Sequence, residues 1–373
     1  MDHLQTEKRP NGGLVTWLAA GFGRILISLI VPAVTFVFLW QGFLFLKNTE
    51  MSQLLMVIFA IIWGVGGVTL LFFATNWFVE RLPGKWTAKL QPFVFVGPGI
   101  AILAWYLAIP TVRTLIFSLY NATGKIFVGL ANYQFALTDR NMLEAFRNNL
   151  LWMVVGTFFS VGLGLIIAVL ADRSRFESIY KSIIFLPMAI SFVGAGVIWK
   201  FMYTYKGEGS GIAEIGLLNA AIIALGGQSQ PWLQTPPWNN FLLIVIMVWL
   251  QTGYCMVILS SAIKGISTEM LEAARVDGAT EFQVFFQIII PAIQGTILTV
   301  TTTILIFSLK LFDIVRVMTG GNYGTNVIAN EFYLQRFTYG SSGRAAAIAI
   351  VLLVAVIPIM IYNLRQFRER KAF

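Results

Sequence analysis

Long apolar stretches alternate with short polar ones along almost the whole chain. A helix needs roughly 17–25 mostly apolar residues to cross the hydrocarbon core of a bilayer, so each long stretch predicts a membrane-spanning helix. Eight segments meet this requirement: Ile25–Leu46, Leu54–Val79, Phe93–Ile109, Leu150–Ala171, Ser182–Trp199, Phe241–Ile263, Ile293–Leu311 and Ala345–Tyr362. The pattern predicts an all-α integral membrane protein with two N-terminal helices and a core of six.

The polar segments divide this pattern into unequal parts. We expect a cytoplasmic tail at residues 1–24 and two extra helices with a basic linker at residues 25–92. The core is expected at residues 93–363, followed by a second cytoplasmic tail at residues 364–373. The first apolar stretch is too long for a signal-peptide core, and no small-residue cleavage pattern follows it, so we interpret it as a retained anchor.

One polar segment, residues 264–291, lies between two predicted spans and has strong local signals. Ser267 can cap a helix whose first turn carries Glu269, which is favourable at the positive end of the helix dipole. Gly278 falls where this helix should end, because glycine accepts a positive φ without steric cost.

A second helix is predicted directly after this turn. Thr280 and Gln283 have the spacing of a capping box, and the residues that follow are apolar as far as Pro291. The segment therefore predicts a helix–turn–helix displayed to the cytoplasm.

The composition agrees with a membrane protein, since 57% of the residues are hydrophobic, 12% are charged and the mean hydropathy is +0.77. An even number of spans places both termini on one side, and the basic ends favour the cytoplasm. Lys47 alone in the first external loop contrasts with Arg81, Lys85 and Lys89 in the next, cytoplasmic one. The net charge of +9 therefore reflects topology and contact with anionic lipid head groups. The sequence has no basic stripe of the kind that binds nucleic acid, so nucleic-acid binding is not predicted.

Candidate catalytic chemistry is sparse. The chain has one cysteine, Cys255, within a predicted span, and one histidine, His3, near the N-terminus. The sequence contains no metal-ligand cluster, no nucleophile elbow and no G-x-x-x-x-G-K-[ST] loop. We therefore expect no catalytic residue, no metal and no cofactor in this chain.

Residues 264–291 contain a set of residues whose spacing is similar to a known family signature. Glu272-Ala273-Ala274, Gly278, Ile288 and Ile290-Pro291 resemble the EAA signature of permease subunits in bacterial binding-protein-dependent ABC importers, with isoleucine at 290 in place of leucine. The resemblance extends over roughly residues 93–373.

Other motifs are similar to those of the sugar-permease branch. They are Val128–Tyr133, Asn149, Phe185–Pro187 and Thr319–Gly321, although the last continues with Asn322-Tyr323 where the branch has Gly-Pro. The extra N-terminal spans resemble those of maltose-type permeases, without their large external domain. The most similar subgroup is the permeases for α-glucosides and glucosylglycerol.

The resemblance implies a coupling role for the polar segment. A separate ATPase subunit would receive it in a cleft, with Glu272 pairing with a basic residue and the small Ala273 and Ala274 allowing close approach. Asp277 and Gly278 would complete this contact at the turn. The alternative is a solvated amphipathic loop without a partner.

The resemblance also implies a solute site between the fifth, sixth and seventh predicted spans. Polar side chains at membrane depth usually face a cavity or another helix. The matching positions are Met188, Phe192, Leu250, Gln251, Tyr254, Phe307, Ser308 and Leu311. Only Leu250, Tyr254 and Phe307 keep the residue type of the maltose-type permeases. Helix–helix hydrogen bonding is the alternative role of the polar members.

The predicted function is a permease subunit of an ATP-driven importer for a sugar or glycosylated solute, in a bacterial inner membrane. The implied partners are the lipid bilayer, a second homologous permease, two ATP-binding subunits that hold ATP and Mg²⁺, and an extracytoplasmic solute-binding protein. The alternative is a secondary transporter for a small polar solute, which should show internal repeats and ionisable residues at mid-membrane. A membrane enzyme would need a reactive cluster, and a structural membrane protein would not need the EAA spacing.

Overall fold

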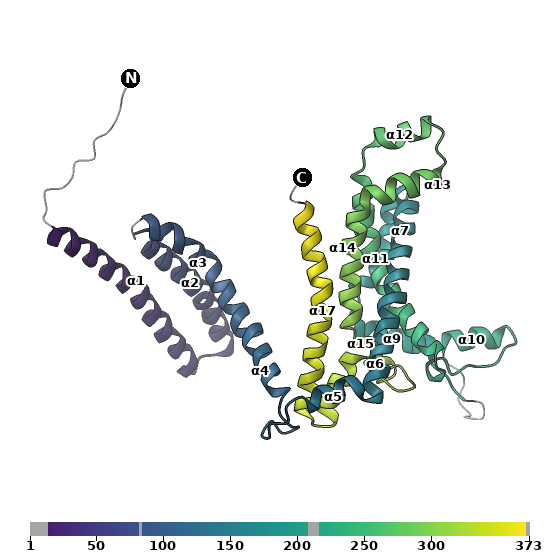
Figure 1. Ribbon diagram of the computed structural model, residues 1–373, viewed down its shortest axis with the longest axis horizontal. Helices are drawn as coiled ribbons and strands as arrows, with labels where there is room; N and C mark the ends of the chain where they lie inside the picture. Colours follow the sequence, from purple (N-terminus) through teal and green to yellow (C-terminus); the bar gives the residue numbers. More distant parts are fainter. Residues whose placement is uncertain (1–13, 82–83, 208–215, 371–373) are drawn as a thin grey trace. The chain divides into compact units, whose positions relative to one another are not determined.

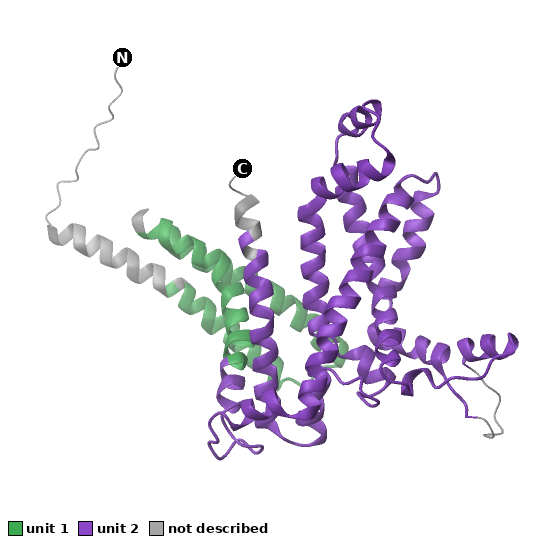
Figure 2. Ribbon diagram, turned by 45° about the vertical axis from the view of Figure 1, so that its right-hand side comes forward, with its two compact units in different colours: residues 1–111 green, residues 112–373 purple. Residues whose placement is uncertain are grey.

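The computed structural model describes residues 14–81, 84–207 and 216–370, and within these residues the chain is built from helices joined by loops (Figure 1). Extended pairing in the described part is limited to an isolated bridge between Tyr120 and Phe127. The predicted tails at residues 1–24 and 364–373 lie partly outside the described residues. The chain divides into two compact units, residues 1–111 and 112–373 (Figure 2).

The first unit holds the N-terminal helices. They are α1 (Leu14–Asn48), α2 (Gln53–Glu80), α3 (Gly84–Leu103), the π-helical turn η1 (Ala104–Ala108) and the start of α4 (Ile109–Phe117). The ring of Trp63 on α2 lies against Gly42 of α1, where a larger residue would clash, and its Nε1 donates to the carbonyl of Leu39 at 3.3 Å. Most other large apolar side chains described in this unit are exposed, as expected for surfaces that face lipid.

The second unit holds the remaining helices. In chain order they are α5 (Ala131–Thr138), α6 (Arg140–Leu151), η2 (Trp152–Gly156), α7 (Thr157–Asp172), α8 (Glu177–Phe185), η3 (Leu186–Ala189), α9 (Phe192–Tyr203), α10 (Leu217–Ala224), η4 (Trp232–Gln234), α11 (Trp238–Lys264), α12 (Thr268–Val276), α13 (Glu281–Gln283), η5 (Val284–Ile289), α14 (Ile290–Leu309), α15 (Asp313–Met318), α16 (Ile328–Tyr333), η6 (Leu334–Thr338) and α17 (Ser342–Arg370).

Helix α11 is the centre of this unit and packs against both α7 and α14. Its side chains Leu243, Met247 and Leu259 are fully buried in the main hydrophobic core. Small residues allow the backbones to come close, as at Gly253, where an added Cβ would lie 2.5 Å from the carbonyl oxygen of Ile184. Close approach through small residues is typical of helices that pack within a membrane.

The prediction of eight membrane spans is not confirmed. Within the described residues, six helical segments are long and apolar enough to cross a bilayer: Gln53–Glu80, Trp86–Phe117, Arg140–Asp172, Trp238–Lys264, Glu281–Met318 and Ser342–Asn363. The first predicted span lies in α1 and is not among them, and the side chains of residues 14–29 lie outside the described part.

The fifth predicted span, Ser182–Trp199, is not one straight helix. Residues Glu177–Ala189 and Phe192–Tyr203 are bent by 101° relative to each other, and counting the pair as one span raises the total to seven. The bend follows Pro187, the second residue of a short 3₁₀ turn, and Ser191 then caps α9 by accepting from the N–H of Gly194 at 3.0 Å. Proline and a new N-cap together explain why the helix restarts in another direction.

Motifs that are distant in the sequence converge in the second unit, at the end opposite to α12 (Figure 1). Asn149 donates to the carbonyl of Leu309 at 3.1 Å and accepts from the N–H of Ile328 at 2.8 Å. The adjacent Asn148 donates to the carbonyls of Gly324 and Asn326, both at 2.8 Å. These buried carboxamides hold the loop after α15 against the start of the fourth predicted span.

Candidate coupling and solute sites

The polar segment of residues 264–291 forms an elbow that stands clear of the membrane helices at one end of the second unit (Figures 1 and 2). The predicted caps are confirmed. Ser267 accepts from the N–H of Met270 at 3.3 Å, Gly278 has a φ of +81°, and Thr280 and Gln283 form a capping box. Each of these signals depends only on neighbouring residues, which explains why the sequence predicts them.

The second helix of the elbow does not stop at Pro291. It continues from α13 through the π-helical turn η5 into α14, so that the elbow and the seventh predicted span form one continuous helical segment. Proline lacks an N–H and crowds the preceding turn of an α-helix, and the wider π-helical hydrogen bonding of η5 accommodates it. No break in helical structure therefore separates the second helix of the elbow from α14.

The residues of the EAA signature are displayed rather than buried. Glu272, Ala273, Asp277 and Gly278 are exposed, and Ala274 is half-buried. No ion pair to Glu272 occurs within the described residues. Apolar side chains are exposed on the same elbow, namely Met270 at 52%, Val276 at 87% and Phe282 at 72%. Exposed apolar side chains on the same segment as an uncompensated carboxylate are typical of a protein–protein contact.

An ion-pair network holds the elbow to the rest of the unit. Glu281, the first residue of α13, accepts from Nε of Arg275 on α12 at 2.9 Å and pairs with Arg173, which follows α7 directly. All three side chains are about half exposed, so solvent screens both ion pairs and each pair alone contributes little to stability. One carboxylate shared by two guanidinium groups fixes α12, α13 and the end of α7 relative to one another.

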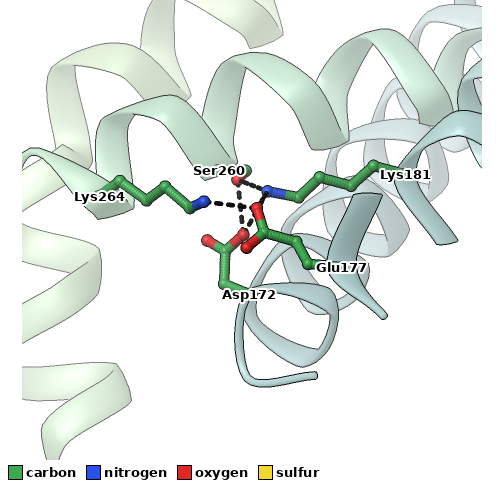
Figure 3. Close-up of polar contacts among 5 residues, drawn as sticks. All are labelled: Asp172, Glu177, Lys181, Ser260 and Lys264. Carbon is green, nitrogen blue, oxygen red and sulfur yellow. Dashed lines mark hydrogen bonds and ion pairs between the residues drawn. The ribbon is translucent and has the colours of Figure 1, made fainter. Parts of the chain in front are cut away.

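A second ion-pair network includes Asp172, the sequence neighbour of Arg173 in the first network (Figure 3). Lys181 of α8 contacts the carboxylates of Asp172 and Glu177 and the hydroxyl of Ser260, which itself donates to Asp172 at 2.7 Å. Lys264, the last residue of α11, reaches Glu177 from the other side at 2.5 Å. The side chains of Asp172 and Lys181 are only 12% and 18% exposed, so this cluster joins the ends of α7, α8 and α11 in a partly desolvated setting.

Sequence reasoning missed this cluster. The one available signal was the spacing of Glu177 and Lys181, which at four residues apart meet on a helix face. The other members come from two further helices, Asp172 from α7 and both Ser260 and Lys264 from α11, and their proximity to α8 arises only from tertiary packing.

The predicted solute residues occupy different settings. The rings of Phe192 on α9 and Phe307 on α14 are in contact, with centroids 4.9 Å apart. Leu250, Ser308 and Leu311 are buried in the core, and the hydroxyl of Ser308 donates to the carbonyl of Ile304 at 2.8 Å.

Gln251, Tyr254 and Met188 differ from these core residues. Gln251 is 8% exposed and Tyr254 is half-buried, and neither side chain makes a hydrogen bond within the part of the chain that the structure describes. Met188 lies in η3, at the bend of the fifth span, and is 42% exposed. Two polar groups on one turn of the central helix are therefore available to a ligand or to a neighbouring subunit.

Comparison with known families decides the identity of this fold. The family described as "Binding-protein-dependent transport system inner membrane component" matches residues 160–371, which include the elbow, both ion networks and α17. The chain belongs to this family. It is a permease subunit of an ABC importer for a sugar or related solute.

Curated relatives of this permease are similar over most of its length. The "Osmoprotective compounds uptake permease protein GgtC" of Synechocystis sp. is 54% identical over 278 residues, which cover 74% of this chain and 99% of the relative. The "Alpha-glucoside transport system permease protein AglF" of Rhizobium meliloti is 45% identical, covering 85% of this chain and 98% of the relative.

A solved structure has the same fold. A chain of a bacterial alginate ABC transporter, determined in complex with an alginate pentasaccharide-bound periplasmic protein, superposes with a TM-score of 0.65 at 20% identity. The match covers 74% of this chain and 93% of the other.

Proposed function

We propose that this permease subunit forms part of the translocation path for an α-glucoside, a disaccharide such as sucrose or trehalose, or glucosylglycerol, and that the elbow couples it to a separate ATP-binding subunit. The observation that carries the proposal is the elbow itself. It displays Glu272 and exposed apolar side chains at one end of the unit and continues without a break into α14.

The coupling step follows from rigidity. The capping box, the Arg173–Glu281–Arg275 network and the continuous helix from Glu281 make the elbow and α14 one mechanical body. A push on the exposed face around Glu272, Ala273, Ala274, Asp277 and Gly278 would then be transmitted as a rigid-body movement of the membrane helices. In this proposal ATP and Mg²⁺ are held by two copies of the ATP-binding subunit, and this chain contributes no catalytic residue and no metal ligand.

The solute path is assigned to α9, α11 and α14. Aromatic rings of Phe192 and Phe307 offer an apolar wall, while Gln251 and Tyr254 offer polar groups without partners in the described residues. Met188, Leu250, Ser308 and Leu311 complete the proposed set. A combination of a few polar groups with aromatic walls is what recognition of sugars requires.

The proposed assembly lies in a bacterial inner membrane with both termini in the cytoplasm. It includes a second homologous permease and an extracytoplasmic solute-binding protein, which the family description "binding-protein-dependent" supports. The printed names of the two relatives, which concern osmoprotective compounds and alpha-glucosides, support the proposed solute class.

Uptake measurements test the proposed solute class. Cells with and without this chain are given radiolabelled sucrose, trehalose and glucosylglycerol. A secondary transporter, whose uptake depends on an ion gradient, serves as the reference. We expect uptake of at least one of the three to depend on this chain and on intracellular ATP. Uptake that persists without ATP but collapses with the proton or sodium gradient would contradict the proposal.

A further inference from the structure

A cavity of about 670 Å³ with a mixed polar and apolar lining lies in the second unit, next to α5 at the end opposite to the elbow. One wall comes from α5 and the loop before it, and the other comes from the turn that joins η6 to α17. Val128, Ala131 and Asn132 line it, and all three belong to the motif Val128–Tyr133, which the coupling elbow and the proposed solute path leave unused.

The motif builds a fixed wall. Asn132 is 7% exposed and donates to the carbonyls of Ser118 at 2.8 Å and Tyr120 at 2.7 Å, while the hydroxyls of Tyr133 and Ser118 lie 2.6 Å apart. A Cβ on Gly343 would collide with the carbonyl of Tyr120, so the start of α17 packs directly on this segment. The cavity is therefore bounded by buried, hydrogen-bonded backbone.

The lining is rich in groups that both donate and accept hydrogen bonds. Four carboxamides face it, from Asn121, Asn132, Asn141 and Gln335, and a hydroxyl is added by Ser341. The Nδ2 of Asn132 and the Oδ1 of Asn121 are already used within the protein, which leaves the Oδ1 of Asn132, the Nδ2 of Asn121 and the carboxamide of Asn141 for a ligand. Together these groups both donate and accept, which complements hydroxyl groups.

Aromatic and charged groups complete the lining. Phe135 and Tyr339 supply ring surface. The guanidinium of Arg344 lies over the ring of Phe135 at 4.2 Å, and Asp139 accepts from the N–H of Asn141 at 2.9 Å. One positive and one negative side chain give the lining no net formal charge, which favours a neutral ligand over an ion.

Gln335 adds a direct sign of incomplete hydrogen bonding. It is 5% exposed, and its Nε2 donates to Glu331 at 2.8 Å. Its Oε1 has no hydrogen-bond partner among the described residues. This oxygen is itself enclosed by protein, so Gln335 contributes to the shape of the cavity wall and is not a free acceptor.

We propose that this cavity binds a neutral polyhydroxylated solute, of the sugar or glycosylated-polyol class, at a site distinct from the residues of α9, α11 and α14. This inference depends on the proposed function in one respect, because the proposed function gives the side of the membrane from which the solute arrives. The volume lies within the range of about 300–1,000 Å³ that is typical of small-molecule sites.

Cysteine protection tests this site. Cys255 is the single cysteine of the chain and is fully buried, so it gives little background with a maleimide reagent. Ala131→Cys places a thiol on the cavity wall without removing a polar group, and Thr338→Cys places one on an exposed position of η6 outside the cavity. The labelling rate of each is measured on the full chain in nanodiscs, with the subunits that co-purify, so that both faces are accessible.

We expect millimolar sucrose or glucosylglycerol to slow labelling of Ala131→Cys several-fold and to leave Thr338→Cys unchanged. Adding Gln335→Leu or Arg344→Gln should remove the protection without changing the labelling rate in the absence of sugar. Arg344 is exposed, so this second variant keeps the test valid if Gln335→Leu fails to fold.

Three results would overturn the inference. They are no protection by any of the sugars, equal protection by glycine betaine, and protection by the solute-binding protein alone, which would make the cavity a protein-docking socket. Labelling requires neither ATP nor transport. A failure of sugar uptake would therefore leave this result intact, and the two proposals can fail separately.

Discussion

Gly164 of α7 lies directly against Cys255 of α11. A Cβ built on Gly164 would be 2.5 Å from the Cβ of Cys255 and 3.0 Å from the backbone nitrogen of Met256. The two helices therefore touch through their backbones at the centre of the unit. Gly162, two residues earlier on the same helix, has open space where a side chain would lie.

This difference predicts opposite outcomes for two matched substitutions. Gly164→Ala should destabilise the protein by about 1–3 kcal/mol, because the extra methyl group forces α7 and α11 apart. Gly162→Ala should be neutral or slightly stabilising, because alanine favours the helix. The apparent Tm of the purified complexes checks this, and equal Tm values for both variants would show that the α7–α11 contact yields easily.

The two lysines that contact Glu177 should differ in importance. Lys181→Met leaves the poorly exposed Asp172 without its cation, and hydrogen bonds to charged groups contribute about 1.5–3 kcal/mol. Lys264 is 53% exposed and solvent screens its pair with Glu177, so Lys264→Met should lower the Tm less than Lys181→Met does. Thermal unfolding of the two variants measures the difference, and a larger loss for Lys264→Met would refute the ranking.

Variants on the polar face of α11 should impair transport without releasing the ATP-binding subunit. A net contact to a sugar hydroxyl contributes about 0.5–1.5 kcal/mol, so Gln251→Ala and Tyr254→Phe should each lower uptake at sub-saturating solute several-fold or more. Val245→Ala is the control, because Val245 lies on the same helix and is 45% exposed. Membrane levels of the complex are matched before uptake is compared. Wild-type uptake by both polar variants would place the solute path elsewhere.

The accuracy of the sequence prediction follows the range of the interactions involved. The caps at Ser267, Gly278 and Thr280 depend on residues within one helical turn, and the structure has all of them. The path of the chain at Pro187 and Pro291 was less predictable. Both prolines lie in apolar stretches, yet one precedes a bend of 101° and the other lies inside a continuous helical segment.

The remaining features depend on contacts across the fold. Asp172, Lys181 and Ser260 belong to three helices, and no local pattern places them together. The number of spans also could not be fixed from hydropathy. An apolar stretch of adequate length predicts that a segment can cross a bilayer, but not whether packing bends it, as it does between Ala189 and Phe192.

The most direct test of the central claim is capture of the ATP-binding subunit by the tagged permease carrying Glu272→Lys. The account predicts that this charge reversal releases the ATP-binding subunit or abolishes solute-stimulated ATP hydrolysis, because a positive charge would face the proposed basic partner. Gly278→Asp should act in the same direction, since its φ of +81° makes a side chain cost about 1 kcal/mol or more. Glu50→Lys, an exposed charge reversal in the loop between α1 and α2, should retain both capture and hydrolysis. Normal capture together with normal solute-stimulated hydrolysis in the Glu272→Lys and Gly278→Asp variants would contradict the coupling role of the elbow.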